Sequence, residues 1–158
     1  LLRYVQERVT ITSLHSAFRP EVVDWIEGQI REFQPWKFSI VHRDLRLRHL
    51  LLPKNKTPVL IDWEFANISE PAQDLAKLIF DGVVNHGKDY TTFIKHVLSR
   101  YSQARRISYD ELLSRVLVFL PIIPLEHTAS FVARKPLGYA EAVDADLAFI
   151  QKIYEQNQ

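Results

Sequence analysis

The chain has 158 residues, a length that fits one domain, and its 47% hydrophobic and 25% charged residues are typical of a globular protein. Twenty Lys and Arg residues nearly balance nineteen Asp and Glu residues, which argues against nucleic-acid binding through bulk positive charge. The absence of cysteine excludes disulfides, thiolate zinc sites and cysteine nucleophiles, and it favours a reducing, cytoplasmic location. The longest apolar run, residues 116–125, is shorter than the roughly 20 residues of a membrane span, and no secretory signal is recognisable, so no membrane partner is expected.

The first part of the chain predicts one helix followed by a compact β region. Apolar residues recur at helical spacing from Pro20 to Phe33, and Pro35 ends that pattern. Three short runs rich in β-forming residues follow, at residues 38–41, 50–52 and 58–61. The polar piece between the last two runs, 53–57, has the length of a hairpin turn.

From Pro71 onward the pattern is helical. Apolar residues return every three or four positions in each segment, and Ser108 with Glu111 three residues later forms a capping box. Pro121 and Pro124 are expected to end or kink the helix that begins at Ser108, before a further helical piece begins at Glu126. We expect helices over residues 71–87, 90–101, 108–119, 126–134 and 139–154. The fold class predicted is α+β, mainly helical.

The predicted strands deliver carboxylates where they end. Asp44 lies in a loop just past the first strand, and Asp62 stands at the end of the third, so both acids can converge. His42 and His49 flank Asp44 in the same loop. Two carboxylates with an imidazole suit a hard divalent cation together with a general base.

Basic residues cluster around these acids. Five of them fall within fourteen positions of an otherwise balanced chain: Arg43, Arg46, Arg48, Lys54 and Lys56. Positive charge beside metal-binding carboxylates suits a polyphosphate substrate, because a transferring phosphoryl group carries spread negative charge. For the two lysines, which flank a turn, a solvated hairpin surface is the simpler interpretation.

Three sequence blocks carry a family resemblance: His-Arg-Asp-Leu at 42–45, Ile-Asp-Trp-Glu-Phe-Ala at 61–66 and Pro-Ala-Gln-Asp-Leu-Ala at 71–76. Their order and spacing resemble the catalytic loop, the metal-binding strand end and the following helix of kinases. The chain thus resembles the aminoglycoside phosphotransferase and choline kinase group, which are small-molecule kinases with a protein-kinase-like fold. The resemblance covers about residues 42–77.

This resemblance implies roles for individual residues. Asp44 would accept or orient the proton of an acceptor hydroxyl, and Arg46 would lie near the transferring phosphate and bind the nucleotide. His49 and Asp62 would hold Mg²⁺ or Mn²⁺ on the phosphates of ATP or GTP. Glu64 is a candidate ligand for a second metal.

His42 and Asp74 would support the catalytic loop structurally rather than react. The sequence departs from the family at His49, where Asn is usual and macrolide-type phosphotransferases carry His, and at Arg43, where the small-molecule members usually have Gly. A neutral imidazole is able to bind the metal in place of the amide.

The resemblance also implies that residues 1–158 form only a carboxy-terminal lobe. No glycine-rich turn and no strand lysine with a helix glutamate partner precede Pro20, so the amino-terminal lobe of a longer parent is expected to be missing. Within the lobe we expect a leading helix in 1–35, a catalytic and metal-binding β region in 36–70 and a helical acceptor-side part in 71–158.

Other interpretations remain open. A catalytically silent, pseudokinase-type binding domain would explain the same motifs, with His49 as drift. A metallohydrolase site built on His42, Asp44 and His49 leaves Asp62 and its neighbours unexplained. The acceptor is expected to be a small hydroxyl compound, with a cationic one such as an aminoglycoside, choline or thiamine suited to the acids of the helical part. Those acids are Asp81, Glu126, Glu141, Asp144 and Asp146.

Overall fold

The computed structural model describes residues 20–34, 38–54, 57–134 and 137–158. They form two compact units, one within Leu1–Gln34 and Leu117–Gln158 and the other within Pro35–Val116. Helices dominate both units, and within the described residues all the strands belong to the second. The chain is therefore an α+β protein that is mainly helical, as expected.

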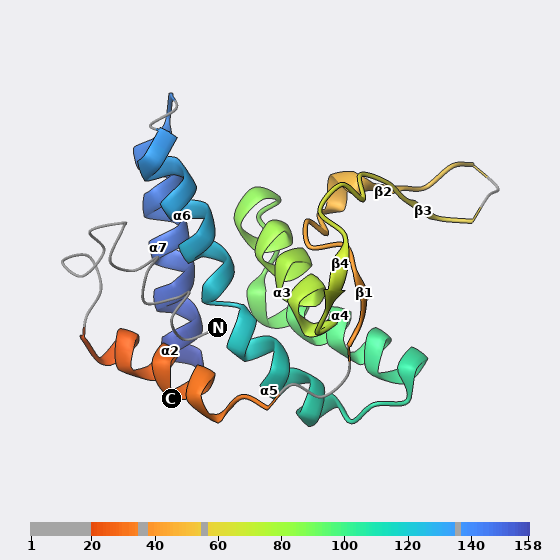
Figure 1. The fold of residues 1–158 in the computed structure, drawn as a ribbon, viewed down its shortest axis with the longest axis horizontal. Coiled ribbons are helices and arrows are strands. Elements are labelled where there is room, and N and C mark those ends of the chain that lie inside the picture. The colour runs from red at the N-terminus through yellow and green to blue at the C-terminus, as the bar shows by residue number, and fades with distance from the viewer. Residues whose placement is uncertain (1–19, 35–37, 55–56, 135–136) are drawn as a thin grey trace. The chain divides into compact units, whose positions relative to one another are not determined.

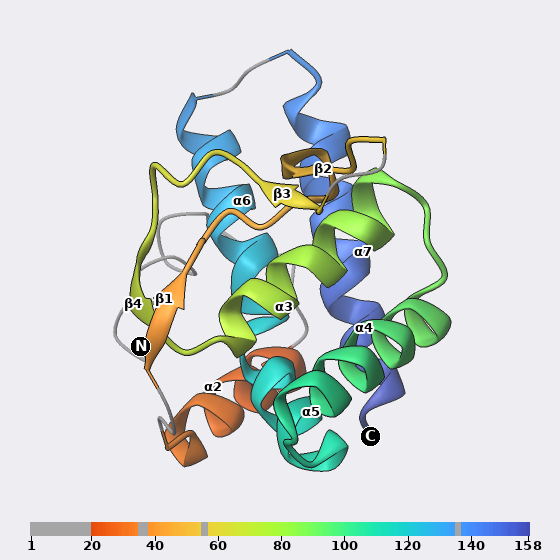
Figure 2. The same cartoon turned by 90° about the vertical axis from the view of Figure 1, so that its right-hand side faces the viewer.

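The β region of the second unit consists of two small antiparallel pairs. Strand β1 (Ser39–Val41) pairs with β4 (Asn67–Ser69), and Figure 2 shows these two strands side by side. Strands β2 (Leu50–Leu51) and β3 (Val59–Leu60) form the expected hairpin. The short 3₁₀ turn η2 (Leu47–His49) leads directly into β2. The two pairs place the segment 42–49 between the end of one strand and the start of another.

The helices of the second unit begin with α3 (Ala72–Phe80), which continues into η3 (Asp81–Asn85), a single turn of π-helix. The apolar face of α3 is fully buried, and its members are Leu75, Ala76, Ile79 and Phe80. Helix α4 (Tyr90–Arg105) follows and packs against α3 (Figure 1). Helix α5 (Tyr109–Phe119) ends beyond the boundary between the units.

The first unit contains α2 (Pro20–Glu32), α6 (Ile122–Arg134) and α7 (Tyr139–Gln156). Helices α6 and α7 lie side by side (Figure 1), and α2 packs on α7. Val22, Ile26 and Ile30 repeat every four residues on α2 and are all buried, as the helical spacing requires. The Trp25 and Tyr154 rings meet edge to face at 5.7 Å between centroids.

Most predicted elements agree with the structure, and the differences have local causes. Strand β4 was not predicted, because Asn67-Ile68-Ser69 lacks a run of β-forming residues. Helix α6 begins at Ile122 rather than Glu126, since Pro124 lies in its first turn, where backbone N–H groups have no intrahelical partner. The expected helical part 71–158 divides between the two units after Val116.

The helical stretch Tyr109–Ser130 is 22 residues long and apolar enough to cross a membrane by length and composition. However, 67% of its most apolar part is buried within the chain. Core helices pass the same test, because burial in a protein and burial in lipid select similar side chains. The stretch is weak evidence for a membrane span, and the expectation of no membrane partner stays a prediction.

Candidate active site

The loop after β1 is held from α3 by one carboxylate. The Asp74 oxygens accept hydrogen bonds from two consecutive backbone amides, those of His42 (2.7 Å) and Arg43 (2.8 Å). Arg43 has a positive φ of 66°, a conformation that non-glycine residues adopt rarely. Charge-assisted bonds to both amides stabilise this turn of the backbone. Asp74 therefore lies where the family resemblance places a structural support for the loop.

His42 is fully buried and serves as an internal connector. Its Nδ1 accepts the backbone N–H of Asp44 at 3.3 Å, so the ring proton lies on Nε2 and is donated to the Ile61 carbonyl at 2.7 Å. One neutral imidazole thus joins the loop of Asp44 to the residue that precedes Asp62. This explains why the two segments converge although 18 positions separate their acids.

Asp44 lies beside two cations. Arg46 Nε donates to its Oδ1 at 2.8 Å, and Lys77 Nζ lies 3.6 Å from the same oxygen. Burial by itself would raise the pKa of the Asp44 carboxyl. The hydrogen bond and charge of Arg46, with the charge of Lys77, outweigh burial and hold that pKa below its ordinary value of 3.8. Asp44 is therefore ionised at neutral pH.

His49 is buried and presents one nitrogen to Asp62. Its Nδ1 lies 2.8 Å from the Asp44 carbonyl oxygen, and because a carbonyl only accepts, Nδ1 carries the proton. The lone pair is then on Nε2, which lies 3.3 Å from the Asp62 Oδ2. A metal-binding histidine is normally held in this way, with its other nitrogen donating to an oxygen.

One ligand atom from each of Asp44, His49 and Asp62 lies within 4.8 Å of the others. Asp62 is 45% exposed at its side chain and has a positive φ of 70°. Non-glycine residues at positive φ are uncommon and cluster at ligand-binding sites. Carboxylate oxygens suit Mg²⁺ or Mn²⁺, and a neutral imidazole nitrogen suits Mn²⁺ better than Mg²⁺. The donor set therefore fits a divalent cation held mainly by Asp62 and His49.

Two expected site residues stand differently from the others. Glu64 is exposed and does not belong to this group of ligand atoms, and its part in a second metal site stays a prediction. Arg46 lies beside Asp44 and is hydrogen-bonded to it rather than extended toward solvent.

Arg48 Nε donates a hydrogen bond to His49 Nε2 at 3.0 Å, so the Arg48 side chain must move away before that nitrogen can bind a metal.

Lys77 is a site residue that the sequence interpretation missed. It lies on α3, three residues after Asp74, and its side chain is 12% exposed. Residues three and four apart share one face of a helix, so Asp74, Lys77 and Asp81 form a polar stripe opposite the apolar face. Once Asp74 was assigned to support the loop, this spacing could have pointed to Lys77.

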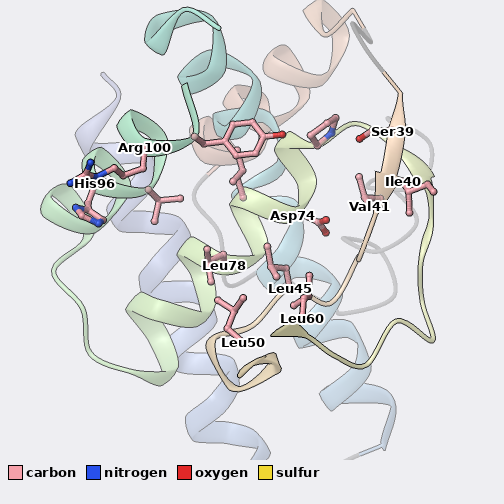
Figure 3. A pocket seen from close by; sticks show the side chains of 14 residues that line it. Ser39, Ile40, Val41, Leu45, Leu50, Leu60, Asp74, Leu78, His96 and Arg100 are labelled. Carbon is pink, nitrogen blue, oxygen red and sulfur yellow. The ribbon is translucent and has the colours of Figure 1, made fainter. Parts of the chain in front are cut away.

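Asp74 also lines a cavity of about 530 Å³, together with residues of β1, α3 and α4. Figure 3 shows Leu45, Leu50, Leu60 and Leu78 gathered at one end of it, with His96 and Arg100 of α4 apart from them. None of Asp44, His49 and Asp62 lines this cavity. It therefore belongs to the packing of the loop on α3 and α4 rather than to the cluster of ligand atoms.

Comparison with known proteins agrees with this geometry. No curated protein matches the chain. The model of the Phosphotransferase enzyme family matches residues 1–111, which is more than half of the chain and includes the loop, Asp62 and α3. The chain thus belongs to the phosphotransferase enzyme family.

Proposed function

We propose that the chain carries the catalytic loop and metal ligands of an ATP- or GTP-dependent phosphotransferase that transfers the γ-phosphate to a hydroxyl group of a small molecule. The observation that carries the proposal is the convergence of an ionised Asp44 with His49 and Asp62 within 4.8 Å. Family membership supports phosphoryl transfer in general. The donor, the acceptor group and the metal are our inference from the donor set.

In the proposed reaction the acceptor oxygen forms a bond to the γ-phosphorus while the bond to the β-phosphate oxygen breaks. The acceptor proton passes to Asp44, and the nucleoside diphosphate leaves. A carboxylate of low pKa is a weak base, so Asp44 acts chiefly by orienting the hydroxyl, which suffices because the transition state is loose. Arg46 and Lys77 keep this carboxylate charged and in place. Bound Mg²⁺ or Mn²⁺ would offset charge on the phosphates.

The exposed apolar surface of the β region supports the further proposal that another lobe covers it. Among the described residues, all but one of the exposed large apolar side chains lie between Phe38 and Ile68. Phe38, Ile40 and Leu52 are 66%, 73% and 77% exposed. Exposed apolar side chains gathered in one region of a protein, when they adjoin, mark an interaction site. We propose that the amino-terminal lobe of a longer protein packs there and completes the nucleotide cleft.

The acids of the helical part bear on a cationic acceptor. Asp81 and Asp146 are buried and bonded within their own units, so neither is open to an acceptor. Glu141 and Asp144 are exposed on α7, and Glu126 is partly exposed on α6. A small hydroxyl compound remains our proposal for the acceptor, and a cationic group on it stays a prediction from the acidic residues of the sequence.

One observation favours the alternative of a binding domain without catalysis. Arg48 Nε already donates a hydrogen bond to His49 Nε2, the nitrogen whose lone pair a metal would use. In an inactive relative, a cation held within the protein can take the place of the metal. This alternative keeps the fold and nucleotide binding but removes turnover.

The test is phosphate transfer by the full-length protein that contains this chain. ATP and GTP are each supplied with Mg²⁺ or Mn²⁺, and a panel of aminoglycosides, choline, thiamine and simple alcohols is screened for a phosphorylated product. Acceptor-dependent, metal-dependent transfer is the expected result. Nucleotide binding without transfer to any acceptor would favour the binding domain, and neither binding nor transfer would contradict both interpretations.

A further inference from the structure

A second buried carboxylate, Asp81, accepts a hydrogen bond from the backbone of the loop 42–49. Asp81 is only 3% exposed and lies at the start of the π-helical turn η3. Its Oδ2 accepts the backbone N–H of Leu47 at 2.9 Å, across 34 positions of sequence. Asn85 Nδ2 donates to its other oxygen at 2.9 Å, and His86 Nε2 lies 3.4 Å from Oδ2. Asp81 is therefore not a surface acid for an acceptor.

The contact at Leu47 falls at the start of the turn that carries His49. Leu47 is the first residue of η2 and His49 is the last. Arg46, at the N-cap position of η2, makes no side-chain cap bond. A helical turn leaves its first N–H groups without internal partners, and a carboxylate there is stabilising. Asp81 supplies from another element the cap that the loop itself lacks.

The two ends of the loop are thus held by two acids of one helical stripe. Asp74 binds the backbone at residues 42 and 43, and Asp81 binds it at residue 47. They are seven residues apart, or two helical turns. The reacting carboxylate, Asp44, lies between these two attachments.

The π-helical turn itself is closely packed, which limits where Asp81 can move. A Cβ placed on Gly82 would collide with the Phe93 ring of α4. The bond from Asn85 links Asp81 to the far end of the same turn. Single π-helical turns inside helices are frequent at functional sites.

We propose that Asp81 is a positioning residue of the phosphotransfer site, one that holds η2 so that His49 presents its Nε2 to Asp62. This inference rests on the proposed function, because it assigns a role within that same site. It does not require Asp81 to touch a substrate. Groups that orient metal ligands from behind typically change metal affinity by 10- to 100-fold when removed.

Two variants separate the hydrogen bond from the charge. Asp81→Ala removes the acceptor for the Leu47 amide. Asp81→Asn keeps an amide oxygen for it, and the amide of Asn85 can rotate to offer its own oxygen to the new NH₂ group. The matched control is Asp89→Ala. Asp89 caps α4 by accepting from the Thr92 amide at 2.9 Å, so it makes the same kind of bond away from the loop.

The experiment measures two quantities in the full-length protein without turnover. Amide hydrogen exchange at Leu47 reports the bond, and calorimetric titration with Mn²⁺ reports the site. We expect Asp81→Ala to speed Leu47 exchange by roughly tenfold, the value of one lost hydrogen bond, and to weaken Mn²⁺ binding by roughly 10- to 100-fold. Asp81→Asn should stay within a few-fold of wild type in both, and Asp89→Ala should leave both unchanged. If Asp81→Ala does not fold, Asp81→Ser is measured in its place.

Three outcomes would overturn the inference: unchanged Leu47 exchange or Mn²⁺ affinity in Asp81→Ala, an Asp81→Asn variant as damaged as Asp81→Ala, or equal weakening of Mn²⁺ binding in Asp89→Ala. Neither measurement needs an acceptor. Absence of phosphate transfer in the wild-type protein would therefore contradict the proposed function. The hydrogen-exchange and Mn²⁺-titration measurements would still decide whether Asp81 is a positioning residue.

Discussion

Two of the histidine–carboxylate clusters among the described residues are built differently. The first joins Asp44, His49 and Asp62 in the unit Pro35–Val116. The second joins His127 of α6 with Asp146 of α7 in the other unit. Each histidine has a nitrogen within 3.3 Å of a carboxylate oxygen.

The second cluster is closed. Asp146 is fully buried, and its Oδ2 accepts from His127 Nδ1 and from Thr128 Oγ1, both at 2.9 Å. A buried carboxylate with two donors is satisfied within the protein, and its bonds tie α6 to α7. We interpret this cluster as structural.

The first cluster is open. The Asp62 side chain is 45% exposed, and each of the three residues directs a ligand atom toward the other two. Positive φ at Arg43 and Asp62 shows that the backbone holds uncommon conformations to do so. We propose that the acceptor atoms of the first cluster serve a ligand, whereas those of the second serve stability.

Asp44→Ala is the substitution with the largest expected effect on activity. Removal of a positioned catalytic base typically lowers the rate by about 10² to 10⁴-fold. In the full-length protein kcat should fall in this range, and the melting temperature should fall as well, because the ion pairs of Asp44 with Arg46 and Lys77 are lost. Activity within a few-fold of wild type would end the assignment and favour the non-catalytic binding domain.

The metal ligands are compared through Asp62→Ala and His49→Asn. Asp62→Ala should abolish metal-dependent nucleotide binding, since it removes the exposed hard oxygen ligand. His49→Asn should keep activity, because the amide oxygen can replace the imidazole nitrogen as a donor. Calorimetry with ATP and Mn²⁺ measures the binding, and the phosphate-transfer assay measures the activity. A structure with nucleotide and metal in which His49 points away from the ion would refute the shared site.

Asp146→Ala tests the closed cluster, where we expect an effect on stability and none on metal binding. It leaves the buried donors of His127 and Thr128 without the carboxylate, which typically costs about 1 to 3 kcal/mol of unfolding free energy. Metal affinity should not change, because no atom of the cluster belongs to the open site. Urea denaturation of the full-length protein and Mn²⁺ titration check the two halves. Weaker Mn²⁺ binding without loss of stability would contradict the structural role that we assign to the His127–Asp146 cluster.

Strong periodicity made the helices and the β hairpin predictable. Apolar side chains that repeat every three or four residues have one way to be buried together, as Val22, Ile26 and Ile30 show. The convergence of Asp44 and Asp62 was also predictable, because each follows a short apolar strand. Helix starts and the polar strand β4 carry weaker local signals.

The polar partners could not be predicted in the same way. Lys77 and Asp81 carry charged side chains on α3 and η3, where a sequence pattern indicates only a solvated surface. Their partners, Asp44 and Leu47, lie more than 30 positions away in sequence. Asp146 likewise looked like a surface acid of α7, and only its contacts with α6 show it to be buried. Long-range hydrogen bonds decide these cases, and no local periodicity encodes them.

The smallest expected effect concerns the pH dependence of the open cluster and the part of Arg46 in it. Burial raises the pKa of the Asp44 carboxyl, and Arg46 is the main cation that lowers it below 3.8. A folded-state pKa below the unfolded one stabilises the protein fully above the unfolded value, and this contribution is lost as pH falls through the folded pKa.

Arg46→Ala leaves burial opposed only by the charge of Lys77, so the Asp44 pKa should rise. The acid limb of the kcat profile should then move to higher pH, and the acid limb of the stability curve should move in the same direction, because the carboxylate takes up its proton earlier. Lys95→Ala, which removes an exposed cation of α4, is the control and should move neither limb. If the Arg46→Ala profile coincides with that of wild type at every pH, the Arg46 hydrogen bond does not set the charge of Asp44. The ionised state of Asp44 would then depend on Lys77 rather than on Arg46.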